Sequence, residues 1–169
     1  MTMKTDEKIK NDVKTELEWG SRLSGSRIYT EVNQGIVTLS GHVESYPKKI
    51  NITKVIERIE NVISVINFLE VKLPLIHYRT DRDIERSVTA CIKWNTTIDD
   101  THIVCKVQNS VVILEGSVEW DYQRSKAGIL AGDITGVTDV KNLISVSTSS
   151  QNLFLKNNSI SDKGNYLRP

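Results

Sequence analysis

Few side chains in this chain of 169 residues are of a type that could do chemistry. The three histidines, His42, His77 and His102, are spread along the chain and form no zinc-ligand motif, so we interpret them as surface histidines. The run Asp99-Asp100-Thr101-His102 places two carboxylates beside an imidazole. It falls where a helix-to-strand turn is expected, and Asp and Thr are typical turn and capping residues. We therefore expect no metal centre.

The remaining reactive groups also fit a structural interpretation. Cys91 and Cys105 fall at apolar-face positions of the hydrophobic pattern, which favours buried thiols, with a disulfide as the alternative. The chain contains no G-x-S-x-G, P-loop or G-x-G-x-x-G motif. Gly128, Gly132 and Gly136 are spaced by four on a polar helix, which indicates tight packing on a sheet. We expect a protein that is not an enzyme, with no catalytic residue and no cofactor.

Charge and hydropathy exclude further classes. The 22 basic and 21 acidic residues give a net charge of +1, which argues against a nucleic-acid partner. A KH-type RNA-binding module also needs a G-x-x-G loop and a basic groove, and the sequence has neither. No apolar run approaches the ~18 residues of a transmembrane segment, and the first residues, MTMKTDEKIKN, contain no apolar export signal. We expect a cytoplasmic protein that can still associate with a membrane surface.

An internal repeat is the strongest pattern in the sequence. Sixteen residues between positions 6 and 71 recur identically, without a gap, 75 positions later. The recurring residues are mostly apolar, with Gly and Trp, so they indicate a fold rather than a reaction. The repeat predicts domains at 6–71 and 81–146, a linker at 72–80, and a mostly disordered tail at 147–169.

Each repeat predicts helix, strand, strand, helix and strand in that order. Apolar residues recur at helical spacing in 6–18 and 81–93. Two alternating runs follow, then a second helical stripe and a last strand at about 63–72 and 138–147. A helical crossover makes the last two strands parallel with a right-handed connection. The expected fold class is α+β, with two tandem α-β-β-α-β units, each a three-stranded mixed sheet with both helices on one face.

The two copies differ at the hairpin turn. The first copy has Asn33-Gln34-Gly35, where Gly35 is expected to supply a positive φ. The second copy has Gln108-Asn109-Ser110. Asn109 tolerates the left-handed region, so we expect a turn there with less strict requirements.

Four more residues mark structural turns, caps or close approaches. Gly41 and Gly116 interrupt their strands at equivalent positions, and we interpret both as sites where a helix packs closely over the strand. Asn61 and Gly136 end the second helix of each copy and are expected in the left-handed C′ conformation.

The most informative surface is the sheet face that the helices leave uncovered. Alternation predicts that this face is apolar in both units, which is unusual for a face in water. In one interpretation the two sheets pack against each other or against a second chain. In the other, the face receives a lipid or a protein partner. The residues of this predicted interaction face are Tyr29, Ile36, Ile66, Phe68, Val104, Val111, Ile113 and Leu143.

Large apolar residues outside the sheets give two more expectations. Leu75, Ile76 and Tyr78 make the linker too apolar for a free tether, so we expect it to pack on a unit. Trp19 and Trp94 end the first helix of each copy and are expected to fold over the edge of the core.

The pattern resembles the BON domain family. The resemblance rests on three elements that occur in both units. Each unit starts with Thr-Asp-x-x-Ile, and the segments Val32–Val43 and Val107–Val118 surround the strand glycines. The units end with Asn61-Val-x-x-Val-x-Asn-x-Leu-x-Val and Gly136-Val-x-x-Val-x-Asn-x-Ile-x-Val. It covers 6–71 and 81–146. The chain departs from the family pattern in having Ser110 and Asn61 where the family usually has Gly.

The resemblance implies a small binding module without catalytic residues. Members of the family are associated with phospholipid surfaces, osmotic and envelope stress, and partner binding. We therefore expect a non-enzymatic protein that binds a membrane surface or a protein partner. The alternative is a self-associating structural or scaffold protein without a lipid ligand.

Overall fold

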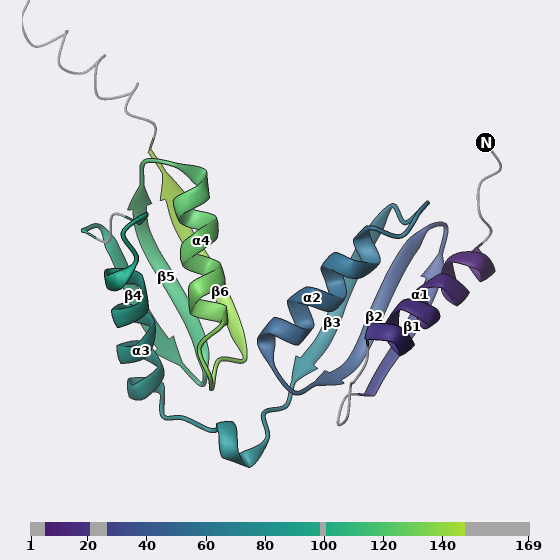
Figure 1. Ribbon diagram of the computed structural model, residues 1–169, viewed down its shortest axis with the longest axis horizontal. Helices are drawn as coiled ribbons and strands as arrows, with labels where there is room; N and C mark the ends of the chain where they lie inside the picture. Colours follow the sequence, from purple (N-terminus) through teal and green to yellow (C-terminus); the bar gives the residue numbers. More distant parts are fainter. Residues whose placement is uncertain (1–5, 21–26, 99–100, 148–169) are drawn as a thin grey trace, which may run out of the picture.

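The computed structural model describes residues 6–20, 27–98 and 101–147, and Figure 1 shows them as two units joined by a linker. The expected disorder of the tail falls on 148–169, outside the described residues, as does the Asp99-Asp100 pair. The first unit contains α1 (Asp6–Gly20), β1 (Arg27–Asn33), β2 (Ile36–Val43), α2 (Tyr46–Glu57) and β3 (Ser64–Val71). The linker contains the short 3-10 helix η1 (Leu75–His77). The second unit contains α3 (Asp81–Trp94), β4 (Ile103–Gln108), β5 (Val111–Val118), α4 (Asp121–Gly132) and β6 (Asp139–Val146).

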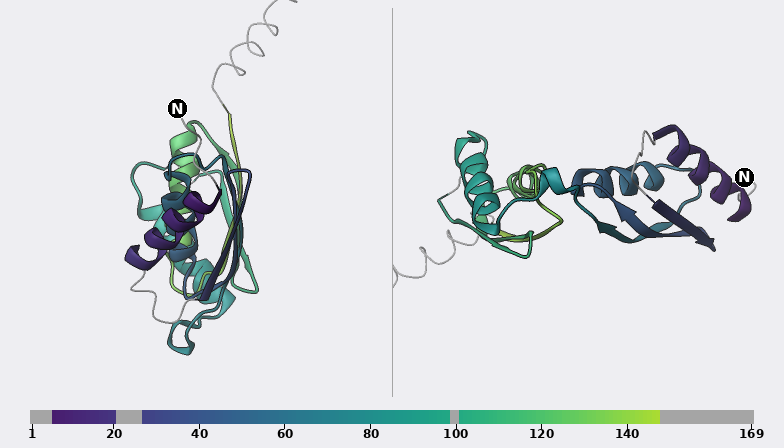
Figure 2. Two further views of the ribbon diagram at one scale, coloured as in Figure 1. Left: turned by 90° about the vertical axis from the view of Figure 1, so that its right-hand side faces the viewer. Right: turned by 90° about the horizontal axis from the view of Figure 1, so that it is seen from below.

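Each unit forms one three-stranded mixed sheet. In the first, β2 lies in the centre, antiparallel to β1 and parallel to β3; in the second, β5 has the same place between β4 and β6. The parallel pair follows from the helix that crosses over between its strands. In both views of Figure 2 the helices lie on one side of the sheets. The predicted α+β fold with two tandem α-β-β-α-β units is confirmed.

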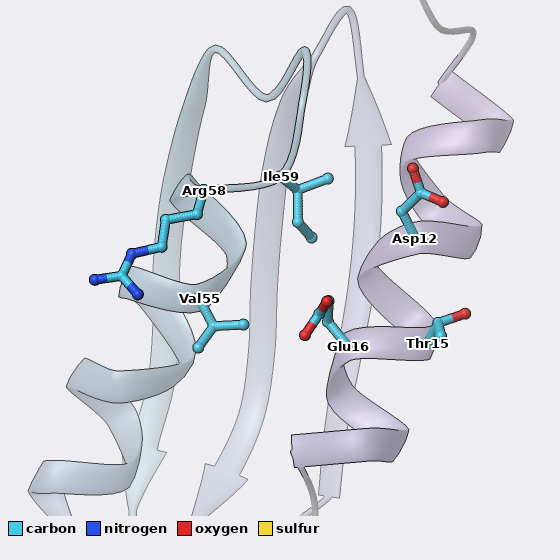
Figure 3. Close-up of a pocket in the computed structure, with 6 residues that line it drawn as sticks. All are labelled: Asp12, Thr15, Glu16, Val55, Arg58 and Ile59. Carbon is cyan, nitrogen blue, oxygen red and sulfur yellow. The ribbon is translucent and has the colours of Figure 1, made fainter.

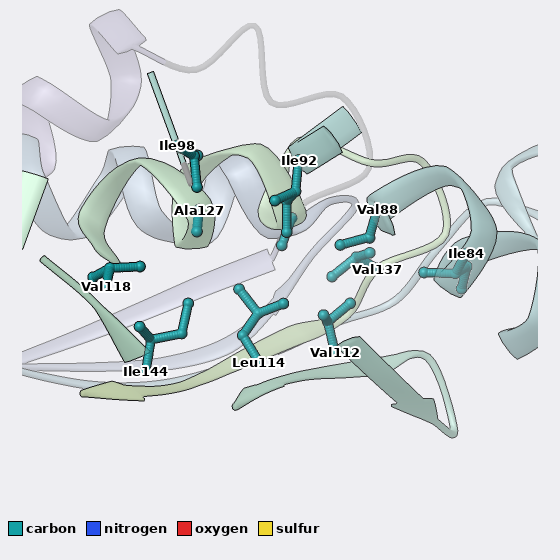
Figure 4. Packing of buried hydrophobic residues seen from close by; sticks show 11 residues of the cluster. Ile84, Val88, Ile92, Ile98, Val112, Leu114, Val118, Ala127, Val137 and Ile144 are labelled. Atoms are coloured by element: carbon teal, nitrogen blue, oxygen red, sulfur yellow. The ribbon is translucent and has the colours of Figure 1, made fainter. Parts of the chain in front are cut away.

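The helices and the sheet of each unit enclose their own apolar core. Figure 4 shows the second core, where Val88 and Ile92 of α3 meet Leu114 of β5. In the first core, Val13 of α1 packs with Leu39 in the same way. Burial of one such side chain contributes about 1.5–3 kcal/mol. Because no buried apolar cluster of the described residues spans both units, each unit has the core of an independent small domain.

The first residue of each unit fixes the hairpin turn. The carboxylate of Asp6 accepts hydrogen bonds from the backbone N–H groups of Gln34 (2.8 Å) and Gly35 (3.0 Å). Asp81 accepts the equivalent pair from Asn109 and Ser110, both at 2.8 Å. A carboxylate that receives two amide donors holds the helix start and the turn together.

The two hairpin turns have the same backbone requirement. Both turn residues have positive φ in the first unit, 50° at Gln34 and 76° at Gly35. In the second unit φ is 52° at Asn109 and 63° at Ser110, so the expectation of a less strict turn is wrong. Two successive left-handed residues are typical of the type I′ turn that matches strand twist. Ser110 adopts this conformation at a cost that the Asp81 bonds help to offset.

The strand glycines are required by the neighbouring strand. Gly41 has φ 111° and Gly116 has φ 124°. A Cβ at Gly41 would overlap the backbone carbonyl oxygen of Arg27, and one at Gly116 would overlap that of His102. The interpretation that a helix packs over these glycines is therefore wrong, because the obstacle is the backbone of the paired strand.

Asn61 and Gly136 adopt the left-handed conformation, with φ 70° and 101°, but not as C′ residues. Helix α2 ends at Glu57 and α4 ends at Gly132. Asn61 lies in a separate turn closed by the Val62 N–H bond to the Ile59 carbonyl. The C-terminal ends predicted for these two helices therefore lie too far along the chain. A separate turn follows each helix before the last strand begins.

An asparagine repeated in both units ties the second helix to the last strand. Asn67 of β3 donates from Nδ2 to Thr53 Oγ1 (2.6 Å), and its Oδ1 accepts from the Leu69 N–H (2.8 Å). Asn142 of β6 donates to the carbonyl of Arg124 at 2.7 Å. This recurring polar residue is thus structural, because its amide satisfies backbone and hydroxyl groups between helix and sheet.

Two expectations about large apolar side chains are wrong. Leu75 of the linker is 90% exposed, and Ile76 and Tyr78 are also exposed, so these three side chains do not pack on a unit. Trp94 is 84% exposed and does not fold over the core edge. The Trp19 side chain lies outside the described part of the chain.

Candidate interaction surfaces

Strand alternation separates the two faces of each sheet. We define outer face 1 as the outward-pointing residues of the first sheet, on the side away from its helices: Arg27, Tyr29, Glu31, Asn33, Ile36, Thr38, Ser40, His42, Ser64, Ile66, Phe68 and Glu70. The register places Tyr29 beside Ser40 and Ser40 beside Phe68. Tyr29 is 59% exposed and Phe68 is 65% exposed. Two aromatic side chains with a small residue between them thus stand in solvent.

Outer face 2 is the equivalent surface of the second sheet: Val104, Lys106, Gln108, Val111, Ile113, Glu115, Ser117, Asp139, Lys141, Leu143 and Ser145. Val104 is 52% exposed and Leu143 is 61% exposed. Lys106 and Lys141 flank Ile113 in the register. The Lys106 ammonium forms an ion pair with Glu115 on the neighbouring strand at 2.6 Å.

All eight residues predicted for the interaction face lie on these two surfaces. Six of them are exposed, while Val111 and Ile113 are partly buried. Figure 2 shows that both helical layers lie on one side of the molecule, so the two outer faces point to the opposite side together. The interpretation that the sheets of one chain pack against each other is therefore wrong. Coverage by a second chain or another partner stays a prediction.

A groove lies on the helical side of the first unit. It has a volume of about 450 Å³ and is lined by Asp12, Thr15 and Glu16 of α1 and by Val55, Arg58 and Ile59 of α2. Figure 3 shows these side chains spread along two separated helices. The Thr15 hydroxyl donates to the Asn11 carbonyl of its own helix (2.9 Å). No nucleophile–base pair lies among these six residues.

A small cavity of about 100 Å³ lies between the units, lined by residues of α2 and α4 that include Tyr46, Ile50 and Ile129. This volume is below the usual size of a small-molecule site. The Tyr46 ring faces Gly132 of the second unit. Burial, followed by the negative charge of Asp139, raises the pKa of Tyr46 above its ordinary value of 10.0. The cavity is therefore a joint between the units rather than a ligand pocket.

The three histidines singled out in the sequence lie in different parts of the fold. His42 lies on outer face 1, His77 in the linker helix, and His102 immediately before β4. Among the described residues, no group of three His, Cys, Asp or Glu side chains could hold a metal ion. Across the same residues, no helix is long and apolar enough to span a bilayer.

Both cysteines are free thiols, so the alternative of a disulfide is excluded in this structure. Burial, with a contribution from Glu85 and an opposing hydrogen bond from Thr89, raises the pKa of Cys105 to about 11. A thiol with this pKa stays protonated at neutral pH and is a poor nucleophile.

A family model of the BON domain matches residues 5–72 and 80–148. This chain belongs to the BON domain family. The matched ranges contain the two units, each with its own sheet and core, so the chain is a tandem BON-domain protein. The sequence resemblance is thereby confirmed.

Osmotically-inducible protein Y of Escherichia coli (strain K12) is a curated relative of this BON-domain protein. The two are 28% identical over 141 residues, which cover 81% of this chain and 70% of the relative. Two solved structures of CdsD, a structural protein of the type III secretion system of Chlamydia trachomatis, also overlay on the chain. The first covers 93% of this chain and 100% of its own, at 11% identity and a TM-score of 0.37. The second, the C-terminal domain, covers 81% and 96% at 11% identity, with a TM-score of 0.35.

Sequence reasoning missed two features of the BON domains. The hairpin clamp by Asp6 and Asp81 was not expected, although its signal was the recurrence of Asp at the same repeat position. The exposed aromatic residues Trp120 and Tyr122 at the start of α4 were also not singled out. The equivalent positions of the first unit hold Ser45 and Pro47, so the repeat gave no signal for them.

Proposed function

We propose that this tandem BON-domain protein is a non-enzymatic binding protein that docks on a protein partner through outer faces 1 and 2. The observation that carries the proposal is the exposure of Tyr29 and Phe68 on a sheet face without helices. A sheet face in water is normally polar, and a contiguous apolar patch marks an interaction site. Val104 and Leu143 repeat the feature on the second domain.

The charges of these faces favour a protein over an anionic phospholipid surface. Phospholipid headgroups attract clusters of Lys and Arg, with about 1 kcal/mol for each basic residue. Outer face 1 carries two acidic residues, Glu31 and Glu70, and one basic residue, Arg27. On outer face 2 the two lysines are balanced by Glu115 and Asp139, so neither face carries a basic cluster. Binding to a phospholipid surface, which the family resemblance implies, is therefore the alternative outcome, and the experiment must distinguish it from binding to a protein.

The relative's name supports a setting for this binding. Because a protein 28% identical to this one is described as osmotically inducible, we propose that the chain acts under osmotic stress. The cytoplasmic location, with association to a membrane surface, also remains a proposal. Fractionation of cells before and after an increase in osmolarity tests both, and recovery in an extracytoplasmic fraction, rather than in the cytoplasmic or membrane fraction, would contradict the location.

Site-specific photo-crosslinking in cells tests the binding surface directly. A photoreactive p-benzoylphenylalanine replaces Phe68, and the matched control carries it at Tyr122, an exposed aromatic of α4 on the helical side. We expect an adduct of protein mass from position 68 that increases under high osmolarity, and none from position 122. A lipid adduct at position 68 would favour the phospholipid alternative.

The crosslinks also separate partner binding from the alternative of self-association. An adduct that contains peptides of this chain alone identifies a second copy, whereas peptides of another protein identify a different partner. If position 68 gives no adduct, outer face 1 is free in the cell and the proposed function is wrong.

A further inference from the structure

We propose that the partner covering the outer faces is a second copy of this chain, with outer face 1 of one copy on outer face 2 of the other. This inference rests on the proposed function, because it names the partner of the same two surfaces. Four properties of the described residues carry it: the common direction of the faces, their combined area, their charges and the sizes of their side chains.

The common direction allows both faces to be covered at once. The two sheets have their helices on the same side, so the two outer faces form one discontinuous surface (Figure 2). A second copy turned over by a two-fold axis presents the same pair of faces to the first. Such an interface is isologous and closed, as in most homodimers. Each contact would be a sheet-on-sheet packing with layers ~10 Å apart.

The combined area reaches what a stable dimer needs. Three strands ~4.8 Å apart and about seven residues long give roughly 330 Å² for one face. Two faces bury about 660 Å² per copy and about 1,300 Å² in total, which lies within the usual range of ~1,200–2,000 Å². A single face would bury only about half of this, so both domains must engage together.

The charges select the pairing of face 1 with face 2. Glu31 of outer face 1 corresponds by the repeat to Lys106 of outer face 2, and Ile66 corresponds to Lys141. Glu31, Glu70 and Lys141 have no ion pair with a described residue of their own chain. Outer face 2 also carries Glu115, which Lys106 already pairs, and Asp139. Packing face 1 on face 1 would oppose the two glutamates, whereas packing face 1 on face 2 brings them near Lys141, which has no ion pair in its own chain, and this favours the mixed pairing.

The side-chain sizes agree with the same pairing. Ser40 of the central strand lies between the rings of Tyr29 and Phe68 on the outer strands. Because the serine side chain is much shorter than the two rings, the surface of outer face 1 is depressed at Ser40. On outer face 2, Ile113 stands between two lysines. The larger central residue of one face fits the lower centre of the other, and lysine stems can cover aromatic rings with the ammonium near the π face.

Charge reversal with mixing tests the pairing. One variant carries Glu31→Lys and Glu70→Lys, and the other carries Lys106→Glu and Lys141→Glu. We expect the wild type to be a dimer by light scattering at micromolar concentration, and each variant alone to dissociate with a dissociation constant raised by about tenfold or more. An equal mixture of the two variants should form dimers again, because both contacts then pair opposite charges.

The control variant carries Glu7→Lys and Glu57→Lys, two exposed glutamates on α1 and α2, and should remain a dimer. Its net charge changes by the same amount as in the Glu31→Lys, Glu70→Lys variant. Circular dichroism of every variant checks that the domains stay folded. A monomeric wild type overturns the inference, as does a mixture that fails to recover. If the wild type is a monomer while position 68 crosslinks another protein, only this inference fails; if position 68 gives no crosslink, the proposed function fails as well.

Discussion

The ring of Tyr46 in the first BON domain lies against Gly132 in the second, so close that a Cβ on Gly132 would stand 2.7 Å from Cδ1 and Cε1 of the ring. Tyr46 begins α2 and Gly132 ends α4, so the contact joins the two second helices at the end near the linker (Figure 1). The joint matters for binding because it sets how the two outer faces are presented to a partner.

Gly132→Ala is expected to open this joint. The added methyl group meets the Tyr46 ring, and overpacking of this kind costs about 1–3 kcal/mol, against a helix-propensity gain of about 1 kcal/mol from removing a helical Gly. Small-angle scattering should show a changed separation of the domains. In the Tyr46→Ala background the same substitution should raise the melting temperature, and a further decrease there would contradict the contact.

High pH should also loosen the joint. The pKa of Tyr46 is raised by burial and by Asp139, so the folded state favours the neutral phenol. Its contribution is fully present below the unfolded pKa of about 10 and is lost as the pH rises through the raised folded value. Scattering profiles from pH 8 to 11 should show the change in the wild type. Tyr46→Phe, which keeps the ring without the ionisable hydroxyl, should show no such transition; an identical transition would exclude Tyr46 as the cause.

Loss of the hairpin clamp should destabilise one domain at a time. Asp81→Ala removes two charge-assisted hydrogen bonds to Asn109 and Ser110, and we expect the second domain to lose about 1–2 kcal/mol. Hydrogen exchange should accelerate at the amides of this turn and not at Gln34 and Gly35. Asp6→Ala should give the reverse pattern, and equal acceleration of both turns would show that the clamp is not local.

Replacing the strand glycine Gly116 with alanine should cost far more stability than replacing the helical glycine Gly128. Gly116→Ala places a Cβ onto the His102 carbonyl oxygen in a backbone with φ 124°, so we expect a loss of about 3 kcal/mol or more. Gly128→Ala is the control, because its Cβ would meet no backbone atom, only the Asn142 side-chain amide, and it should cost at most the hydrogen bond of that amide to the Arg124 carbonyl, about 1 kcal/mol. Urea unfolding measures both. A similar loss of unfolding free energy in the two variants would mean that the backbone at His102 can move away from the added Cβ, and would contradict this prediction.

The comparison of sequence with structure shows where local patterns are sufficient. Apolar spacing placed Val13 and Leu39 in the first core, and the repeat placed Val88 and Leu114 in the second, because helical and strand periods are properties of neighbouring residues. The same reasoning separated the inner from the outer sheet faces. It predicted the exposed positions of Tyr29 and Phe68, since alternation alone determines which side a strand residue occupies.

Two of the errors concern contacts between distant segments. Gly41 was assigned to helix packing, but the obstacle is the carbonyl of Arg27 on the paired strand. Leu75 was expected to be covered, but no part of the folded units reaches it. In both cases the residue type was informative, while its neighbour in space depends on how separate elements approach each other.

The sequence by itself determined the two BON domains, their element order and the apolar character of their outer faces. Only the tertiary structure decided that Asp6 and Asp81 hold the hairpins, that Tyr46 meets Gly132, and that both outer faces point the same way. The physical reason is that periodicity is encoded within a segment of a few residues. The direction of a face relative to another depends instead on the path of the linker and on one side-chain contact between domains.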